Sequence, residues 1–284
     1  MRQAKRMSRG QCVAFANHKG GTGKTTSCLS IAGHLAKGGS KVLVVDFDPQ
    51  ANATSGLGID LMTLKRSMYD AVLDQCDGYE GVPIIQVILE TNVENLHCAP
   101  SELDLAVAEV LMQQTKDRAS ILSRILEEVR PLYDYILIDL PPSSGLLTIN
   151  GLCASDEVVV SLDPSIFSLE SLENLKTSFR DIKRLAGHSI NRIMWVLIRY
   201  AKPDAFSRMF HKSNSSQEVA ARLKEMFHTV FIVPESVEIY QAQKERVPIS
   251  HYAPESGVGK AYAEIAKTIS INTNQKLDLN KQGG

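Results

Sequence analysis

Short runs of consecutive apolar residues alternate along this chain with longer stretches in which apolar residues recur at helical spacing. The short runs predict strands at 12–16, 41–46, 96–99, 135–140, 157–162, 193–198 and 230–233. The periodic stretches predict helices at about 24–38, 101–129, 145–153, 165–186, 205–227, 235–246 and 256–270. Runs such as Val42-Leu43-Val44-Val45 have no polar face, which is typical of strands covered on both sides. The pattern predicts an α/β fold, a single doubly wound domain whose mostly parallel sheet carries helices on both faces.

The most informative segment directly follows the first predicted strand. It reads Lys19-Gly20-Gly21-Thr22-Gly23-Lys24-Thr25-Thr26 and leads into the first predicted helix. A strand, a glycine-rich loop, Gly-Lys-Thr and a helix together indicate a phosphate-binding P-loop. Backbone N–H groups and the helix N-terminus would bind the phosphates, Lys24 would add a positive charge, and the Thr25 hydroxyl would hold Mg²⁺. The common spacing has a glycine where this chain has His18, and a second lysine, Lys19, stands at the mouth of the loop.

Two further strands end in carboxylates. Asp46 and Asp48 follow the apolar run at 42–45, and Asp139 follows the run Tyr135-Ile136-Leu137-Ile138. In open α/β sheets, ligands bind at the carboxyl ends of the strands. An apolar strand ending in Asp is the Walker B pattern, whose carboxylate holds Mg²⁺, often through water. Alone this pattern is weak, but together with the P-loop it predicts a nucleotide and magnesium site.

Composition limits the classes of protein that fit. The 284 residues are 44% hydrophobic and 22% charged, with a formal net charge of −1, which is ordinary for a globular protein. Five singly scattered cysteines indicate reduced thiols and a cytoplasmic location, and no apolar stretch approaches the roughly 18 residues of a membrane span. We expect residues 1–10 to be a disordered basic arm, 11–271 the P-loop ATPase domain and 272–284 a frayed polar tail.

The three nucleotide motifs resemble those of the ParA/MinD family of deviant Walker A P-loop ATPases, and most closely its ParA/Soj branch of partition ATPases. The resemblance runs from about Val13 to Ile269 and includes the run Asp-Pro-Gln-Ala-Asn-Ala-Thr at 48–54, which is the motif most specific to ParA. It implies a slow, partner-stimulated ATPase that uses ATP and Mg²⁺. It also implies an ATP-sandwich homodimer, non-specific DNA binding and a ParB-like partner in DNA partition on the nucleoid.

The resemblance also implies roles for individual residues. Lys19 resembles the signature lysine that reaches the phosphates across the dimer, Lys24 the lysine that binds the β- and γ-phosphates, and Asp48 the residue that orients the attacking water. Thr25 and Asp139 are implied as the magnesium-binding pair. The remaining implied nucleotide-site residues are Gly20, Gly21, Thr22 and Gly23 along the loop, Thr26 at the α-phosphate, Asp46 in support, and Pro234 at the adenine edge.

The predicted DNA surface departs from the family pattern. Glu235 and Glu238 stand where many ParA relatives carry arginine, and glutamate repels phosphate. Residues 176–212 contain nine basic and two acidic residues, a local charge of +7 in a chain of net charge −1. Such asymmetry favours DNA binding on one face, with affinity that falls steeply as salt rises. The candidate contacts are Lys183, Arg184, Arg199, Lys202, Arg208 and Lys212.

Three other functions stay open from the sequence. A MinD-like membrane-positioning ATPase would need an amphipathic C-terminal helix, but 271–279 is poor in apolar residues, so we expect no membrane partner. A cluster reductase related to the nitrogenase iron protein would need bridging cysteines, and the surroundings of Cys98 and Cys153 do not match that role. The third is a ParA-like ATPase that positions a protein assembly in place of DNA.

Overall fold

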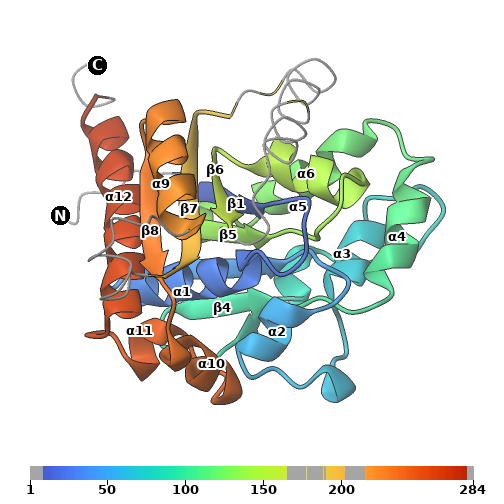
Figure 1. The fold of residues 1–284 in the computed structure, drawn as a ribbon. Helices are drawn as coiled ribbons and strands as arrows, with labels where there is room; N and C mark the ends of the chain where they lie inside the picture. Colours follow the sequence, from blue (N-terminus) through green and yellow to red (C-terminus); the bar gives the residue numbers. More distant parts are fainter. Residues whose placement is uncertain (1–8, 165–176, 178–187, 189, 202–214, 280–284) are drawn as a thin grey trace, which may run out of the picture.

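The computed structural model describes residues 9–164, 177, 188, 190–201 and 215–279. Its centre is a β-sheet flanked by helices (Figure 1). The sheet has eight strands in the order β3-β4-β2-β5-β1-β6-β7-β8. All neighbouring strands are parallel except β3 and β4. The strands are β1 (Gln11–Ala16), β2 (Val42–Asp46), β3 (Leu89–Glu90), β4 (Leu96–Ala99), β5 (Tyr135–Asp139), β6 (Glu157–Leu162), β7 (Arg192–Tyr200) and β8 (Val230–Pro234).

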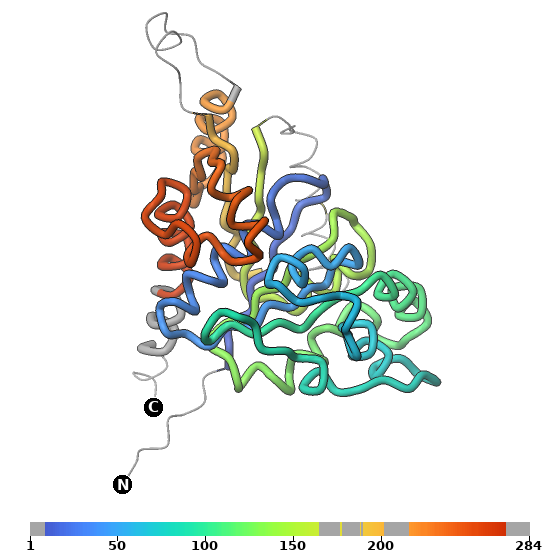
Figure 2. Tube along the Cα trace, turned by 90° about the horizontal axis from the view of Figure 1, so that it is seen from below, coloured from blue at the N-terminus to red at the C-terminus, as the bar shows by residue number. Residues whose placement is uncertain are grey.

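Helices cover both faces of the sheet, which confirms the predicted doubly wound fold. Alternate residues of β1 point to opposite faces: Cys12, Ala14 and Ala16 join one apolar core, and Val13 and Phe15 join the other. The first core includes side chains from α3 (Met68–Leu73), α4 (Leu105–Met112), α5 (Ile121–Glu127), α6 (Leu146–Ala154) and α9 (Ser215–Met226). The second includes side chains from α1 (Lys24–Lys37), α2 (Asn52–Gly56), α10 (Val237–Lys244), α11 (Ile249–Tyr252) and α12 (Gly257–Leu279). Viewed from below in Figure 2, α10 to α12 lie on the opposite side of the fold from α3 and α4.

The predicted elements match the structure well where they are apolar and long. The strands at 96–99 and 157–162 have the predicted bounds, and the other five shift by a few residues. Trp195 packs in the core as predicted, because its ring stacks on Phe227 with ring centroids 4.0 Å apart. The five cysteines are all free and buried.

The single helix predicted over 101–129 is wrong. The segment forms α4, a turn that brings Asp117 into the left-handed region at φ 54°, a 3-10 turn at Arg118–Ser120 and then α5. Helical periodicity persists through the break because both helices bury apolar residues in the same core. The helix predicted at 256–270 continues to Leu279, and the helix predicted at 165–186 falls almost entirely outside the described residues.

Short elements account for the features that the pattern did not predict. They are α2, α3, α11, the two-residue strand β3, and 3-10 turns at Leu61–Thr63, Ile84–Gln86 and Arg130–Leu132. Each has too few residues for a 2-residue or 3.6-residue period to emerge. β3 pairs antiparallel with β4 at the edge of the sheet, and both its residues are exposed.

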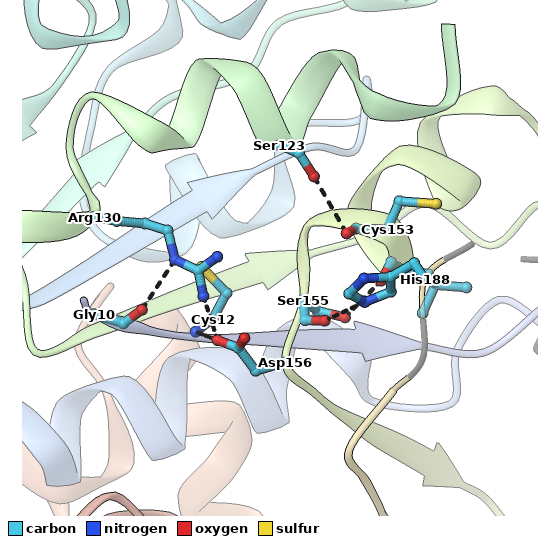
Figure 3. Close-up of polar contacts among 9 residues, drawn as sticks. Gly10, Cys12, Ser123, Arg130, Cys153, Ser155, Asp156 and His188 are labelled. Atoms are coloured by element: carbon cyan, nitrogen blue, oxygen red, sulfur yellow. Dashed lines mark hydrogen bonds and ion pairs between the residues drawn. The ribbon is translucent and has the colours of Figure 1, made fainter. Parts of the chain in front are cut away.

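At the amino ends of β1 and β6, opposite the carboxyl ends of the strands, Arg130 connects neighbouring segments (Figure 3). Arg130 donates from Nε to the Gly10 carbonyl (3.1 Å) and forms an ion pair with Asp156. The Asp156 carboxylate also accepts the Cys12 N–H at 2.8 Å. Gly10, predicted to lie in the disordered arm, is therefore buried and hydrogen-bonded, while residues 1–8 of that arm lie outside the described residues.

Candidate nucleotide-binding site

The three sequence motifs meet at the carboxyl ends of three adjacent strands. β1 lies beside β5, and β5 lies beside β2, so the loops that follow these strands converge. Asp46 and Asp139 are direct register partners, and Phe15 pairs with Asp139 on the other side. The P-loop, Asp46–Asp48 and the Walker B aspartate are thus neighbours because of the strand order, although they are far apart in sequence.

The P-loop has the geometry that phosphate binding needs. Gly21 and Gly23 have φ values of 73° and 72°, in the left-handed region that favours glycine. At Gly23 a side chain is also excluded by space, since a Cβ would lie 2.5 Å from Ile198 Cδ1. The helix α1 begins directly afterwards at Lys24, so its first N–H groups and positive dipole end face the loop.

The Thr25 hydroxyl and the Asp139 carboxylate form the strongest indication of a metal position. Thr25 Oγ1 donates to Asp139 Oδ2 at 2.6 Å, while Asp139 Oδ1 is buried without a hydrogen-bond partner among the described residues. Burial, and then the nearby Asp46 charge, raise the pKa of Asp139 well above its ordinary value. A divalent cation beside this carboxylate would use the unpaired oxygen and reverse that shift. The residues present therefore fit Mg²⁺.

Asp46 is a fully buried carboxylate at the end of β2, paired in register with Asp139 of β5. Its carboxylate accepts the N–H and hydroxyl of Thr54, both at 2.7 Å, and the Asp48 N–H at 3.3 Å. Complete burial still raises the pKa of Asp46 to about 6. Its hydrogen bonds hold the backbone at Asp48 and Thr54, and its charge helps to raise the pKa of Asp139. Asp46 therefore supports the site indirectly. It is not among the residues that line the cavity.

Lys24 of the P-loop and Asp48 of the loop after β2 both line the cavity. Both are buried, at 6% exposure each. Burial lowers the pKa of Lys24, while the charges of Asp139 and then Asp48 act in the opposite direction. Asp48 Oδ1 accepts the Gln50 N–H at 3.0 Å, which holds the carboxylate in place. The cavity lining therefore includes one buried cation and one buried carboxylate, and Asp139, which is not in the lining, is hydrogen-bonded to the lining residue Thr25. An anion with bound Mg²⁺ would complement these charges.

The cavity has a volume of about 590 Å³, a size that suits a nucleotide. Its far wall comes from a region that the motifs did not indicate, namely α10 and the loop after it. Gln243 of α10 donates to the Thr26 hydroxyl at 2.9 Å, which ties this wall to the P-loop. The lining is Gly20 to Thr26, Leu29, Ser30, Asp48, Gln50, Asn52, Ser55, Gly56, Pro142, Arg199, Ile239, Ala242, Gln243, and Arg246 to Ile249.

Arg199 lines this cavity, although the sequence placed it among the DNA contacts. Its backbone has a φ of 49°, unusual for a residue with a long side chain, at an irregularity in the pairing of β7 with β8. Its guanidinium forms an ion pair with the buried Asp163 at 2.6 Å. The other described arginine of the basic region, Arg192, pairs with Glu157 at the opposite end of β7. The remaining DNA candidates lie outside the described residues: Lys183, Arg184, Lys202, Arg208 and Lys212.

Two further predicted site residues, Lys19 and Pro234, are not among the residues that line the cavity. Lys19 is half-buried at the mouth of the P-loop, with its N–H bonded to Asn17 Oδ1 at 3.1 Å and its carbonyl accepting the Thr22 hydroxyl at 3.2 Å. Pro234 ends β8 and pairs with Tyr200. It packs on the start of α12, where a Cβ at Gly257 would lie 3.8 Å from its ring.

This geometry defines the class of the protein. It is a P-loop nucleotide-binding protein, because three features occur together. The sheet is mostly parallel, a glycine loop leads into helix α1, and the Thr25 hydroxyl of Gly-Lys-Thr donates a hydrogen bond to the Walker B carboxylate of Asp139. Comparison with known proteins narrows the class. Residues 10–192 match the AAA domain family AAA_31.

Whole-chain relatives agree with that match. The chain is 36% identical over 266 residues to the sporulation initiation inhibitor protein Soj of Bacillus subtilis, covering 93% of this chain and 99% of Soj. It is 32% identical over 263 residues to the chromosome partitioning protein ParA of Caulobacter vibrioides, covering 90% and 92%. The chain therefore belongs to the AAA_31 family and, within it, to the Soj/ParA group of chromosome-partitioning ATPases.

Solved structures share the fold. Cobyrinic acid a,c-diamide synthase from Mycobacterium smegmatis, crystallised with an ATP analogue and magnesium, superposes with a TM-score of 0.72 at 26% identity, covering 92% of this chain and 94% of that one. The same enzyme has also been crystallised with ADP and magnesium.

Proposed function

We propose that this protein is a ParA/Soj-type ATPase that binds ATP·Mg²⁺, dimerises around it and hydrolyses it slowly. The observation that carries the proposal is the contact of Thr25 with Asp139 beneath a glycine P-loop, with Lys24 and Asp48 facing the same cavity. Phosphoryl transfer to water needs charge neutralisation and positioning, and these residues supply both.

Each residue has a distinct part in this proposal. The P-loop amides and Lys24 would bind the β- and γ-phosphates, and Thr25 and Asp139 would hold Mg²⁺. Asp48 would orient the attacking water, and Lys19 would reach the phosphates of the facing subunit. Bound Mg²⁺ would neutralise the phosphate oxygens during transfer.

Lys24→Ala tests the nucleotide site. Removing a buried charge from the phosphates should weaken ATP binding by about 100-fold or more, since a hydrogen bond to a charged group is worth up to about 3 kcal/mol. Lys37→Ala is the matched control, because Lys37 ends the same helix and donates to the Ser250 carbonyl. Titration with a fluorescent ATP analogue measures both variants. Normal affinity in Lys24→Ala would overturn the assignment of the site.

Asp48→Ala separates binding from hydrolysis. We expect the variant to bind ATP and accumulate a dimer, while turnover falls by at least about 100-fold, as is usual when a positioned base or water-orienting group is lost. Size-exclusion chromatography and phosphate release measure the two effects, with the exposed cap residue substituted in Asp60→Ala as the control. Turnover at the wild-type rate would remove Asp48 from this role.

We further propose that the ATP-bound dimer binds DNA without sequence preference on the nucleoid and is stimulated by a ParB-like partner in plasmid or chromosome partition. The relationship to Soj and ParA supports this, as does the excess of basic residues in 176–212. Affinity carried by Lys and Arg contacts to phosphate would fall steeply with salt.

The alternative is positioning of a protein assembly or of a membrane-bound cargo by the same ATPase cycle. Glu235 and Glu238 favour this alternative, because glutamate repels DNA phosphate at positions where the resemblance to ParA implies basic residues. In the described part of the chain, no helix has the length and apolar character that a membrane span requires. ATP-dependent dimerisation without DNA binding, or flotation with anionic liposomes, would favour the alternative.

A further inference from the structure

Asn17, which none of the three motifs includes, joins the mouth of the P-loop to the neighbouring strand. It directly follows β1 and is buried, at 5% exposure. Its Nδ2 donates to the Ser161 carbonyl of β6 at 2.6 Å, and its Oδ1 accepts the Lys19 N–H at 3.1 Å. The amide orientation follows from its partners, since a backbone N–H can only donate and a carbonyl can only accept.

The contact with Ser161 continues the sheet where the backbone leaves it. The last parallel pair of β1 and β6 is Ala16 with Val160, so Ser161 is the next position on β6. There the side-chain amide of Asn17 takes the place of a backbone donor. The chain can therefore turn away from β1 into the P-loop while its starting point stays attached to the sheet.

The attachment point is itself held from two other elements. Ser161 Oγ donates to Ser27 Oγ of α1 at 3.2 Å, and Ser27 Oγ lies 3.2 Å from the Tyr262 hydroxyl of α12. Ser27 and Ser161 are fully buried, and Tyr262 is 1% exposed. A network of buried, mutually satisfied hydroxyls resists displacement, because breaking any member leaves polar groups unpaired.

Lys19 is the residue that this attachment fixes. Asn17 holds its N–H and the Thr22 hydroxyl holds its carbonyl. The loop that lines the cavity begins only at Gly20, and its conformation is set by the left-handed glycines and the start of α1. Asn17 therefore acts on the lysine at the mouth rather than on the phosphate cradle.

We propose that Asn17 is a positioning residue that sets the direction in which Lys19 leaves the loop, and thereby its reach to the phosphates of a facing subunit. This inference rests on the proposed function, because it needs Lys19 to act during hydrolysis. A purely structural role would lower stability alone. A positioning role lowers the hydrolysis rate at saturating ATP and leaves ATP affinity nearly unchanged.

The first test compares two buried asparagines. Asn17→Ala should lower kcat by about tenfold or more, as small misplacements of a reacting group do, with ATP affinity changed by less than about threefold. Asn150→Ala is the matched control: Asn150 is fully buried and also bridges segments, accepting from Leu122 N and donating to the Arg118 and Leu146 carbonyls, away from the cavity lining. It should lower the melting temperature and leave kcat unchanged. Equal effects of both variants on kcat would overturn the inference.

A double-mutant cycle with Lys19→Ala identifies the residue through which Asn17 acts. If Asn17 positions Lys19, the double variant should be no slower than Lys19→Ala alone. Independent, multiplying losses would overturn the inference and leave the proposed function intact. A Lys19→Ala variant with wild-type hydrolysis and dimerisation would overturn the proposed role of Lys19, and the inference with it.

Asn17→Ser keeps the test decisive if the alanine variant fails to fold. A serine hydroxyl can accept the N–H two residues ahead, as asparagine does, but is too short to keep the bond to Ser161. We expect Asn17→Ser to fold and to have a higher kcat than Asn17→Ala. If Asn17→Ala is insoluble, the kcat of Asn17→Ser should lie between those of wild type and Lys19→Ala. A rate equal to that of wild type in Asn17→Ser would contradict the need for the anchored position.

Discussion

The site concentrates charge on a few buried side chains. Asp46 and Asp139 lie side by side on adjacent strands, and burial raises the pKa of both. Burial lowers the pKa of Lys24 in the same place. Each group is thus shifted toward its neutral form, and the shared cause is the loss of water around it. Phosphate and Mg²⁺ together would supply the missing opposite charges, which explains why such a costly cluster is kept buried.

Arg199 should contribute to nucleotide binding. Its guanidinium is held by the buried Asp163 and lines the cavity, so Arg199→Ala should weaken ATP binding by roughly tenfold, the worth of one charge-assisted contact. Arg192→Ala is the matched control, because Arg192 forms a similar ion pair with Glu157 at the far end of the same strand. Calorimetric titration with ATP measures both. Unchanged ATP affinity in Arg199→Ala with lowered DNA binding would return this residue to the predicted DNA surface.

His34 should make stability depend on pH. Burial and then the Lys37 charge lower the pKa of His34 from 6.5 to about 4, and its Nε2 is buried without a hydrogen-bond partner among the described residues. The unfolded chain therefore binds the proton more readily, and the free energy of unfolding should fall as the pH drops from about 6.5 toward 4. Urea unfolding at several pH values should show a smaller fall in His34→Gln. The exposed His228, substituted as His228→Gln, should leave the wild-type fall unchanged.

At the scale of elements, close packing of α1 against α11 positions the P-loop helix. Gly33 allows this contact, since a Cβ there would lie 2.3 Å from Ser250 Oγ and 2.5 Å from Pro248 Cβ. Pro248 and Ile249 also line the cavity, so this packing sets the distance between the P-loop and the opposite wall.

Gly33→Ala should destabilise the protein by about 1–3 kcal/mol, the usual cost of overpacking a tight helix contact. Gly257→Ala is the control, because its Cβ would meet only Pro234 Cγ, at an ordinary 3.8 Å. Thermal unfolding distinguishes the two. A melting temperature in Gly33→Ala equal to that of wild type would mean that α11 moves away without cost, and ATP affinity would then show whether the cavity wall moved with it.

The sequence predicted the site wherever the chemistry is local. The P-loop glycines, Lys24 and Thr25 are contiguous, and Asp46 and Asp139 each end an apolar strand, so spacing and pattern were sufficient to predict that these segments meet. Their roles toward a nucleotide stay predictions. The wall formed by α10 could not be predicted, because Gln243 meets Thr26 only through the packing of α10 against the P-loop. Asn17 directly precedes the P-loop and Arg199 lies in the basic region, but the sequence does not show what either contacts. The structure shows that Asn17 bonds to Ser161 and Lys19 and that Arg199 lines the cavity.

At the scale of the whole molecule, the P-loop, Asp46 and Asp139 lie at the carboxyl ends of neighbouring parallel strands. Arg130 lies at the opposite ends of the strands, where it contacts Gly10 and Asp156. Lys19 directly precedes the cavity lining, which begins at Gly20, and we propose that it acts on a facing subunit. We therefore expect hydrolysis per protomer to rise with protein concentration until the dimer is saturated. A rate per protomer that is constant down to nanomolar concentrations would contradict a requirement for the dimer.

The most direct test of the account is DNA binding by Asp48→Ala protein, measured with ATP·Mg²⁺ and with ADP across a salt series. We predict tight, sequence-independent binding only with ATP, with log affinity falling linearly against log salt as phosphate contacts are released. Lys24→Ala, whose ATP binding should be weaker by about 100-fold or more, is the negative control. An ATP-dependent dimer that binds no DNA, or equal DNA binding with ADP, would contradict the proposal that ATP switches this protein onto DNA.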